Sequence, residues 1–420
     1  NIEMGQVDLE GLDSPFTEEE VKCIIDHMPC DKAPGPDGFT GAFFKSCWDI
    51  IKVEVMSVIH NFGNLHVDNF QWLNSANIVL LPKKDGAEDI TEFRPISLIH
   101  AIAKIVSKML AVRLSPHMNN LISNAQSAFI KKRSIHDNFM YVRNLARRLH
   151  KNKTSSLLFK LDIRKAFDSV RWEYVLDILQ RCGFPSRFRD WIAALLSTSS
   201  SRVLLNGVPG SPISHGKGLR QGDSMSPLLF VIVIDPLQQL LNSATRIGLL
   251  HKIRGRGTII QTSLYADDTT VFVAPIREDI RNLIDILEGF GEVTGMHTNF
   301  HKRSVVPIRC RHLDLDAILE DMPATRASFP MRYLGLPLSV WQLKRVDYQH
   351  LEDKIANKLV PWEGMHITSI GRGALVKSVL TSQAIHHLTP LIVPPSVLQS
   401  INKIKRAYLW AGTKKVSGGK

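Results

Sequence analysis

Apolar and polar residues follow two different periods along the chain, and this pattern predicts the order of helices and strands. Apolar residues recurring every three or four positions predict amphipathic helices, whereas short β-branched runs predict buried strands. The predicted helices cover residues 21–28, 43–62, 99–118, 135–150, 172–181, 187–196, 225–241, 278–293, 348–360, 373–387 and 398–410. The predicted strands cover residues 76–81, 157–163, 202–205, 213–215, 258–265, 269–273 and 332–337. The order of these elements along the chain indicates an α+β fold, because helices come first, strands mixed with helices follow, and helices alone come last.

Two local signals add detail to this pattern. Thr17 is followed three residues later by Glu20, which is the capping-box arrangement that begins a helix. Asp267 and Asp268 stand between two predicted strands. Because so short a connection joins neighbouring antiparallel strands, we expect a tight hairpin with the Asp pair at its turn.

Length and charge narrow the class of protein. The chain has 420 residues, which suggests two to four domains at roughly 100–200 residues each. Its net charge of +12 suits a polyanionic partner, and the charge comes in blocks. Residues 131–153 hold eight Lys or Arg against one acid, and the last twenty residues hold six and no acid. For either block taken alone, a solvated helix face is about as good an explanation as a surface that binds a phosphate backbone.

Several classes of protein do not fit the composition. The five cysteines are scattered without a C-x-x-C pair, which argues against a zinc site or a disulfide framework. No signal peptide pattern is present, and the apolar run Leu228–Ile234 is far shorter than the ~20 residues that span a bilayer. We expect an intracellular protein of the nucleus or cytoplasm, not secreted and without a membrane partner. The chain begins at Asn1 rather than Met, so we also expect it to be part of a longer protein.

Three carboxylates are the candidates for chemistry. Asp162 lies near the end of the predicted strand 157–163, and Asp267 and Asp268 lie at the predicted hairpin turn. Two-metal nucleotidyl transfer needs a few hard oxygen ligands on rigid neighbouring strands. Adjacent side chains on a strand point to opposite faces, so Asp267 is the better-supported ligand of the pair. An isolated Asp pair is also ordinary turn chemistry, and its interpretation therefore depends on the other motifs.

The neighbouring candidates each have an ordinary explanation as well. Phe167 can pack beneath a sugar and exclude a 2′-hydroxyl, or it can be a core residue. Gln221 and Gly222, in the stretch Gly218–Asp223, can line a templating base pair or form a plain loop. Lys83 and Arg94 can clamp a triphosphate, Lys as a point charge and Arg through its planar fork, or they can be surface bases.

Taken together, these stretches resemble a known family. Phe159–Asp168, Leu219–Asp223 and Tyr265–Asp268 are similar, in order and spacing, to the core blocks of reverse transcriptases. More narrowly, the chain resembles the reverse transcriptases of non-LTR (LINE-type) retrotransposons, particularly those of plants. Five further blocks support the resemblance, namely Lys32–Gly38, Phe93–Leu98, Gln126–Phe129, Tyr333–Leu338 and Gly371–Arg372.

The resemblance implies an activity and a role for each candidate residue. The implied activity is RNA-directed DNA synthesis on an RNA template from a DNA primer, with dNTPs as substrates and two Mg²⁺ ions, for which Mn²⁺ can substitute. Asp162, Asp267 and Asp268 would be the metal ligands and Phe167 the steric gate. Gln221 and Gly222 would contact the incoming nucleotide and the template. Lys83 and Arg94 would bind the triphosphate, and Lys302 would protonate the leaving pyrophosphate.

The resemblance also implies a right-hand polymerase fold with an antiparallel-sheet palm. Its parts are an N-terminal helical extension at 1–70, fingers at 71–155 with part of 199–224, a palm at 156–340 and a helical thumb at 341–420. Ser224-Met225 stands where relatives more often have Pro-Leu. No endonuclease, ribonuclease H or Cys/His-rich segment is present in this sequence, so this chain alone is expected to polymerise without cutting or integrating DNA.

Two alternatives remain open. A group II intron-type reverse transcriptase is the first, and the stretches Tyr333–Leu338 and Gly371–Arg372 argue against it. An inactive retroelement relic that only binds RNA is the second. Decay tends to remove essential residues, and all three carboxylates are present.

Overall fold

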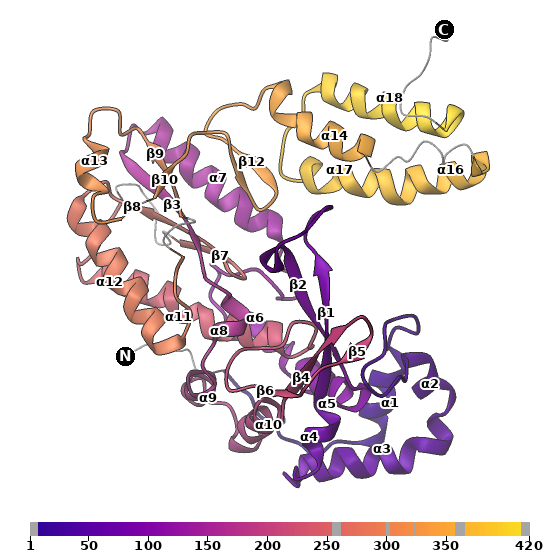
Figure 1. Ribbon diagram of the computed structural model, residues 1–420. Helices are drawn as coiled ribbons and strands as arrows, with labels where there is room; N and C mark the ends of the chain where they lie inside the picture. Colours follow the sequence, from indigo (N-terminus) through magenta and orange to yellow (C-terminus); the bar gives the residue numbers. More distant parts are fainter. Residues whose placement is uncertain (1–6, 254–261, 300–302, 323, 358–365, 413–420) are drawn as a thin grey trace.

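The computed structural model describes residues 7–253, 262–299, 303–322, 324–357 and 366–412. Its centre is a five-stranded sheet in the order β10-β9-β3-β8-β7 (Figure 1). The strands are β3 (Ser156–Asp162), β7 (Thr262–Tyr265), β8 (Asp268–Val273), β9 (Ser304–Ile308) and β10 (Thr325–Arg326). All neighbours are antiparallel except β9 and β10. The antiparallel sheet expected within residues 156–340 is therefore present.

Both faces of this sheet are covered, which explains why β3 reads as a continuous apolar run. Leu157, Phe159 and Leu161 belong to a core that includes α11 (Ser226–Arg246) and α12 (Arg277–Thr294). Leu158 points to the other face and belongs to a second core with α7 (Ile135–Lys151). Because side chains alternate along a strand, Lys160 and Asp162 share the face of Leu158.

A second sheet lies beside the N-terminal helices (Figure 1). In it β1 (Ser75–Pro82) pairs antiparallel with β2 (Phe93–Ile99) and parallel with β4 (Ser200–Leu205), and β4 also pairs with β5 (Val208–Pro209) and β6 (Ile213–Ser214). The segment 200–214 therefore lies with 75–99, far from it in sequence. The helices of the N-terminal part are α1 (Glu18–Asp26), α2 (Gly41–Ser46), α3 (Trp48–Gly63), α4 (Phe70–Leu73), α5 (Ala101–Leu114) and α6 (Met118–Leu121). Between β3 and β4 lie α9 (Trp172–Arg181) and α10 (Ser186–Ser197), and α9 packs on both α10 and α11.

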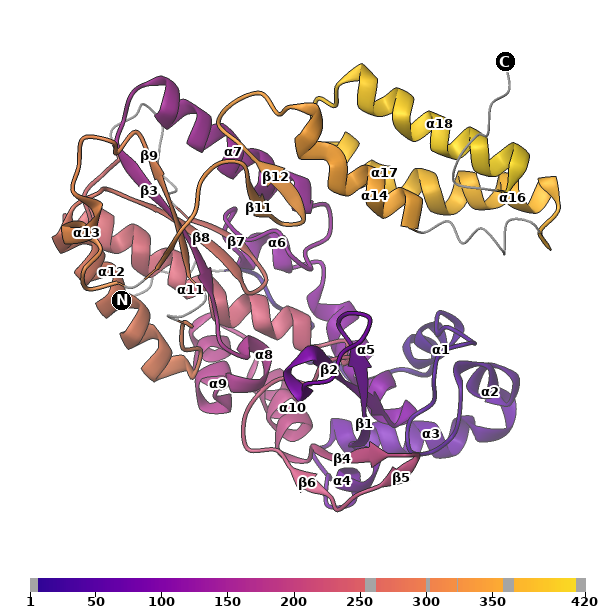
Figure 2. The same ribbon diagram turned by 45° about the horizontal axis from the view of Figure 1, so that its top comes forward.

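The C-terminal part is helical, as predicted, and forms a group of its own in the ribbon (Figure 2). Its helices are α14 (Gln349–Asn357), α16 (Ser369–Leu375), α17 (Thr381–Leu388) and α18 (Pro395–Ala411), and a π-helical turn, η4 (Val376–Leu380), joins α16 to α17. The Arg372 side chain donates from Nε to the Leu409 carbonyl at 2.9 Å and so ties α16 to α18. The domain boundaries placed at 70, 155 and 340 stay predictions.

The structure corrects three of the predicted elements. The helix predicted at 43–62 is divided at Cys47 into α2 and α3. The strand predicted at 332–337 is a hairpin of β11 (Met331–Tyr333) and β12 (Leu336–Leu338). Leu334 and Gly335 between them both have positive φ, as the favoured two-residue hairpin turn requires. The helix predicted at 99–118 begins only at Ala101, because β2 extends to Ile99, and it ends at Leu114.

Strands β2 and β9 were not predicted, and each contains a proline. Pro95 lies in β2 and Pro307 in β9. Proline lacks a backbone donor and is tolerated mainly at sheet edges. β2 is the edge strand of its sheet, and β10 pairs with β9 only at Ser304 and Val305, so Pro307 also lies at an edge.

Among the described residues, one helix is long and apolar enough to cross a membrane by those two measures. It is α11, which is longer than its apolar run suggested. Of its most apolar window, 72% is buried inside the protein. α11 is accordingly the central core helix behind the sheet.

Candidate active site

The pairing of β3 with β8 brings two of the predicted carboxylates together. Asp162 and Asp268 are partners in the register, so their side chains emerge on the same face of the sheet. β7 and β8 form the predicted hairpin, in which Tyr265 pairs with Asp268 across Ala266 and Asp267. Asp267 therefore lies at the turn, whereas Asp268 is already the first residue of β8.

Negative charge at this end of the sheet is only partly balanced. The pKa of Asp267 is raised, first because surrounding protein removes water from the carboxylate and also because Asp268 and Asp162 are negatively charged. The Lys160 Nζ atom lies 3.5 Å from Asp268 Oδ1 and offsets part of that charge. Within the described part of the chain, one lysine pairs with these three carboxylates, and this corner is therefore attractive to cations.

The donor set fits a hard divalent cation. Carboxylate oxygens are the ligands that Mg²⁺ prefers, and a few are enough when phosphates and water complete its coordination. Among the described residues, no three Asp, Glu, His or Cys side chains lie close enough together to hold one ion in common. What the fold provides without the ion is thus a carboxylate pair across β3 and β8 with a third carboxylate on the adjoining turn.

Two further side chains hold these carboxylates in place. Gln126 is fully buried, and its Oε1 accepts hydrogen bonds from the Ala266 backbone N–H at 3.2 Å and from Ala128 N–H at 2.9 Å. Asn299 donates its backbone N–H to the Asp162 carbonyl at 2.7 Å, and its Nδ2 lies 3.5 Å from Asp162 Oδ2. The turn and the end of β3 are both anchored by segments remote in sequence.

The Gly218–Asp223 loop lies against the turn that follows β3. Gly218 N–H donates to the Val170 carbonyl and Leu219 N–H to the Phe167 carbonyl, both at 2.7 Å. The Phe167 ring, half-buried, stacks on Phe230 of α11 with ring centroids 4.2 Å apart. Phe167 therefore packs as a core residue, which was its ordinary explanation. It also lies beside the predicted nucleotide-binding loop.

The same loop reaches the second sheet. The Gln221 carbonyl accepts a hydrogen bond from Ser97 N–H of β2 at 3.1 Å. A Cβ on Gly222, which has φ +104°, would lie 3.1 Å from the Ser97 carbonyl oxygen. Arg220 donates to the backbone carbonyl of the buried residue Asn74 at 2.9 Å. Gln221 and Gly222 thus lie where the second sheet meets the turn that carries Phe167.

The two predicted triphosphate ligands lie on the β1–β2 hairpin. Lys83 follows β1 directly and is exposed, and its Nζ donates to the Thr91 carbonyl at 2.7 Å. Arg94 pairs with Leu81 in the register and is also exposed. Its side chain makes no hydrogen bond or ion pair with any residue that the structure describes. Neither base touches the carboxylates, and Lys302 lies outside the described residues.

Three of the residues that support the site lie inside the sequence motifs, but the sequence did not indicate what they do. Gln126, Lys160 and Arg220 each stand inside a block quoted for the resemblance, and position in a block was the only signal available. Asn299 belongs to the stretch 298–302 that carries Lys302 and was not singled out. Their roles depend on partners 108 to 146 residues away in sequence, which local patterns do not reveal.

Comparison with known proteins agrees with this arrangement. Residues 81–338 match the family described as "Reverse transcriptase (RNA-dependent DNA polymerase)". The chain is 28% identical over 417 residues to the "Transposon TX1 uncharacterized 149 kDa protein" of Xenopus laevis, covering 98% of this chain and 31% of that protein.

Two Drosophila melanogaster proteins are also similar. The "Retrovirus-related Pol polyprotein from type-2 retrotransposable element R2DM" is 27% identical over 412 residues, covering 96% of this chain and 37% of that protein. The "RNA-directed DNA polymerase from mobile element jockey" is 24% identical over 348 residues, covering 78% of this chain and 37% of that protein. The chain thus spans about a third of the length of these relatives. Since the family match covers well over half of the chain and includes Asp162, Asp267 and Asp268, this protein belongs to the reverse transcriptase family.

Proposed function

We propose that this chain is the RNA-directed DNA polymerase of a LINE-type, non-LTR retrotransposon, and that it extends a DNA 3′ end on an RNA template. The observation that carries the proposal is the pairing of Asp162 with Asp268 beside the Asp267 turn, inside the part that matches the family. The similarity to the R2DM, jockey and TX1 proteins supports the retrotransposon assignment. A plant source, which the sequence blocks suggested, belongs to this proposal.

In this function Asp162, Asp267 and Asp268 hold two Mg²⁺ ions, for which Mn²⁺ can substitute. Bound metal would supply activation of the primer hydroxyl and stabilisation of the leaving phosphates. Lys160 limits repulsion among the carboxylates, because its ammonium lies beside Asp268. Gln126 and Asn299 keep the turn and the end of β3 in register.

The remaining predicted residues bind the incoming dNTP. Phe167, immobilised by its stacking on Phe230, excludes the 2′-hydroxyl of a ribonucleotide. Gln221 and Gly222 contact the nucleotide and the template from the loop beside β2. Lys83 and Arg94 hold the triphosphate from the β1–β2 hairpin, and Lys302 protonates the pyrophosphate. The partners are an RNA template and a DNA primer, and the site of action is the nucleus or cytoplasm.

Primer extension tests the proposal. Purified protein is incubated with poly(rA)/oligo(dT), dTTP and Mg²⁺, and elongated primers are separated on a gel. We expect extension by the wild type and a loss of at least about a hundredfold in Asp267→Asn, because one ligand of the two-metal site is removed. Asp177→Asn is the matched control, since Asp177 is an exposed carboxylate paired with Arg181 on α9.

The outcomes distinguish an active polymerase from an inactive relic and test the metal ligands. No extension by the wild type with either Mg²⁺ or Mn²⁺, together with retained RNA binding, would favour the inactive relic. Extension that survives Asp267→Asn would contradict the assignment of the metal ligands.

A further inference from the structure

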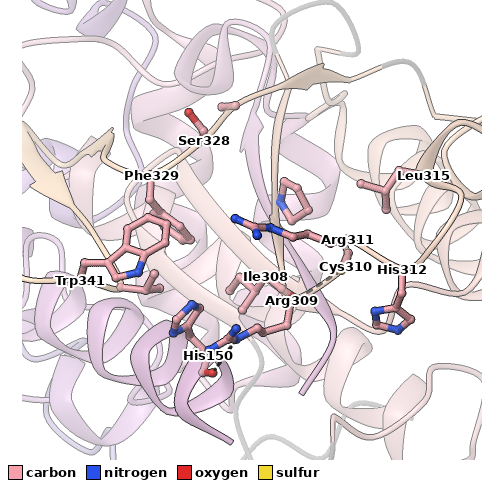
Figure 3. A pocket seen from close by; sticks show the side chains of 13 residues that line it. His150, Ile308, Arg309, Cys310, Arg311, His312, Leu315, Ser328, Phe329 and Trp341 are labelled. Carbon is pink, nitrogen blue, oxygen red and sulfur yellow. Dashed lines mark hydrogen bonds between the residues drawn. The ribbon is translucent and has the colours of Figure 1, made fainter. Parts of the chain in front are cut away.

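A cavity of about 640 Å³ lies at the opposite end of the central sheet from the carboxylates. Figure 3 shows the side chains that line it. Its walls are the end of β9 with the segment that follows it, Ala327–Phe329, Val340–Trp341 and His150 near the end of α7. Ile308 pairs with Ser156 at the start of β3, whereas Asp162 is the last residue of β3. Six residues of strand separate the two points by roughly 20 Å. The cavity is therefore distinct from the candidate active site.

Among the residues that the structure describes, the charged side chains that line this cavity are all basic or imidazole groups. Arg309, Arg311, His150 and His312 contribute to its wall, and none of the described acidic residues does. The nearest acids along the chain are already engaged, since Asp314 caps α13 (Leu315–Ile318) and Asp316 pairs with Arg326 at 2.6 Å. Arg311 makes no ion pair or hydrogen bond with any residue in the described part of the chain. The cavity thus contains a guanidinium that is available to an anion.

An exposed aromatic ring stands on the other side of the cavity. Trp341 is 53% exposed and makes edge-to-face contacts with His150 and Phe329, at centroid distances of 5.5 and 6.2 Å. Figure 3 shows Arg311 in the middle of the view, with Trp341 and Phe329 on one side and His312 and Leu315 on the other. An aromatic face and a free cation therefore lie at the same opening.

The backbone that carries Trp341 is held by polar contacts. Arg147 of α7 donates from Nη2 to the Trp341 carbonyl at 3.0 Å and from Nε to the Ser339 carbonyl at 3.3 Å. Trp341 N–H donates to Ser339 Oγ at 3.1 Å. These bonds hold the backbone at Trp341, and the contacts of its ring with His150 and Phe329 favour one orientation of the ring, which lowers the entropy cost of stacking on it.

Arg309 and Arg311 are the two guanidinium groups of the cavity wall. Arg309 donates from Nε to the His150 carbonyl at 3.0 Å, which satisfies a terminal acceptor of α7. The pKa of His150 is lowered, first by burial and then by the charge of Arg309. His150 is therefore largely neutral near pH 7 and serves as a ring surface beside Trp341.

We propose that this cavity binds a nucleotide unit, with its base stacked on Trp341 and its phosphate paired with Arg311. Single-stranded nucleic acid and a free nucleotide share this chemistry. Base stacking on aromatic rings together with cationic contacts to phosphate is the general basis of single-strand binding, and the planar guanidinium suits phosphate oxygens. The volume is in the range of small-ligand sites. A purely apolar ligand would leave Arg311 uncompensated, and a cation would be repelled.

Binding measurements with the active site filled test this proposal. The protein is first saturated with an unlabelled primer–template hybrid, and a fluorescein-labelled single-stranded RNA 12-mer is then titrated in while its anisotropy is measured. We expect Trp341→Ala and Arg311→Glu each to weaken this binding at least about fivefold. Trp72→Ala and Arg345→Glu are the matched controls, because both residues are exposed and neither lines the cavity. AMP is added as a competitor in a second arm.

The outcomes decide whether the cavity binds a nucleotide unit and from which source. Competition by AMP supports a free nucleotide as the ligand, whereas selective loss of RNA binding without AMP competition supports a single strand. Equal RNA affinity in the wild type, Trp341→Ala and Arg311→Glu, with no AMP binding, would overturn the proposal. The readout is binding, so it does not depend on polymerase activity. Asp267→Asn protein should behave like the wild type here even if primer extension fails.

Discussion

At the scale of single residues, Gln126 connects two segments that are 140 residues apart in sequence. One carbonyl oxygen accepts from Ala266, at the turn before Asp267, and from Ala128, two residues after Gln126 itself. Both donors are buried, and a buried N–H that loses its acceptor costs about 1–3 kcal/mol. Gln126 is thus a positioning residue, because it acts on the carboxylates through the backbone of their turn.

Replacing Gln126 by methionine keeps the volume and removes the acceptor. We expect Gln126→Met to lower the free energy of unfolding by about 1–3 kcal/mol. We also expect it to reduce kcat for primer extension, with little change in the KM for the primer–template. Thermal unfolding and steady-state extension measure the two effects.

Gln238→Met is the matched control for this variant. Gln238 is equally buried, but its Oε1 has no hydrogen-bond partner in the described part of the chain, so its loss should cost little. Equal effects of the two substitutions on kcat would argue that Gln126 has no specific influence on the turn.

At the scale of elements, the Gly218–Asp223 loop joins three structures. It hydrogen-bonds to the turn after β3, to β2 through Ser97 and to the segment before β1 through Arg220. Gly218 makes the closest approach, since a Cβ there would lie 2.7 Å from the Asp168 carbonyl oxygen. Its φ of +84° is also strained for any residue with a side chain. The loop can therefore pack against α8 (Ala166–Ser169) only through a glycine.

Gly218→Ala should separate this loop from the turn that carries Phe167. We expect a loss of about 1–3 kcal/mol of stability, because strain and a backbone clash act together. Extension activity per folded molecule should fall as well. Gly216→Ala provides the comparison, as nothing lies within 4 Å of its added Cβ. Equal shifts of the unfolding midpoint in both variants would contradict the proposed close contact of Gly218 with α8.

At the scale of the whole molecule, the helical C-terminal part shares an apolar core with α7 and the β11–β12 hairpin, and imidazoles lie at this junction. His136 Nε2 lies 3.1 Å from His386 Nδ1, and His386 Nε2 lies 3.0 Å from the Leu334 carbonyl oxygen. Next to it, His387 is only 5% exposed, and burial lowers its pKa to about 4. This junction is consequently sensitive to acid.

Acidification from pH 7 to pH 5 should weaken the protein through His387. The unfolded chain takes up a proton near pH 6.5, whereas the folded chain resists protonation until about pH 4. The contribution of neutral His387 to the free energy of unfolding is therefore fully present above pH 6.5. It declines as the pH falls, and about 2 kcal/mol is lost at pH 5. Melting temperatures of the wild type and His387→Leu at both pH values measure it. The variant should lose less stability on acidification.

An exposed histidine supplies the control for this experiment. His66→Leu should retain the full pH dependence of the wild type. If His387→Leu and the wild type lose the same stability between pH 7 and pH 5, another group controls the acid response.

Most elements were predictable because their periodicity is local. The helix at 172–181 has the predicted bounds, and the Asp hairpin is present at 262–273, whereas residues 258–261 of its predicted first strand lie outside the described residues. Strands β2 and β9 were not predicted because Pro95 and Pro307 weaken a strand pattern. Proline is tolerated in them because it lies at an edge of the assembled sheet. The hairpin at 331–338 read as one strand because Leu334 is not a residue from which a positive φ is expected.

By itself, the sequence determined the identity and order of the motifs, and hence the family and the three carboxylates, because these are properties of short contiguous stretches. The tertiary structure alone decided that Asp162 faces Asp268, that Gln126 supports their turn and that Arg311 shares a cavity with Trp341. Each of these relations depends on strand register and on the packing of distant segments. Register and packing follow from burying both faces of one sheet at once, and no single stretch of the chain contains that information.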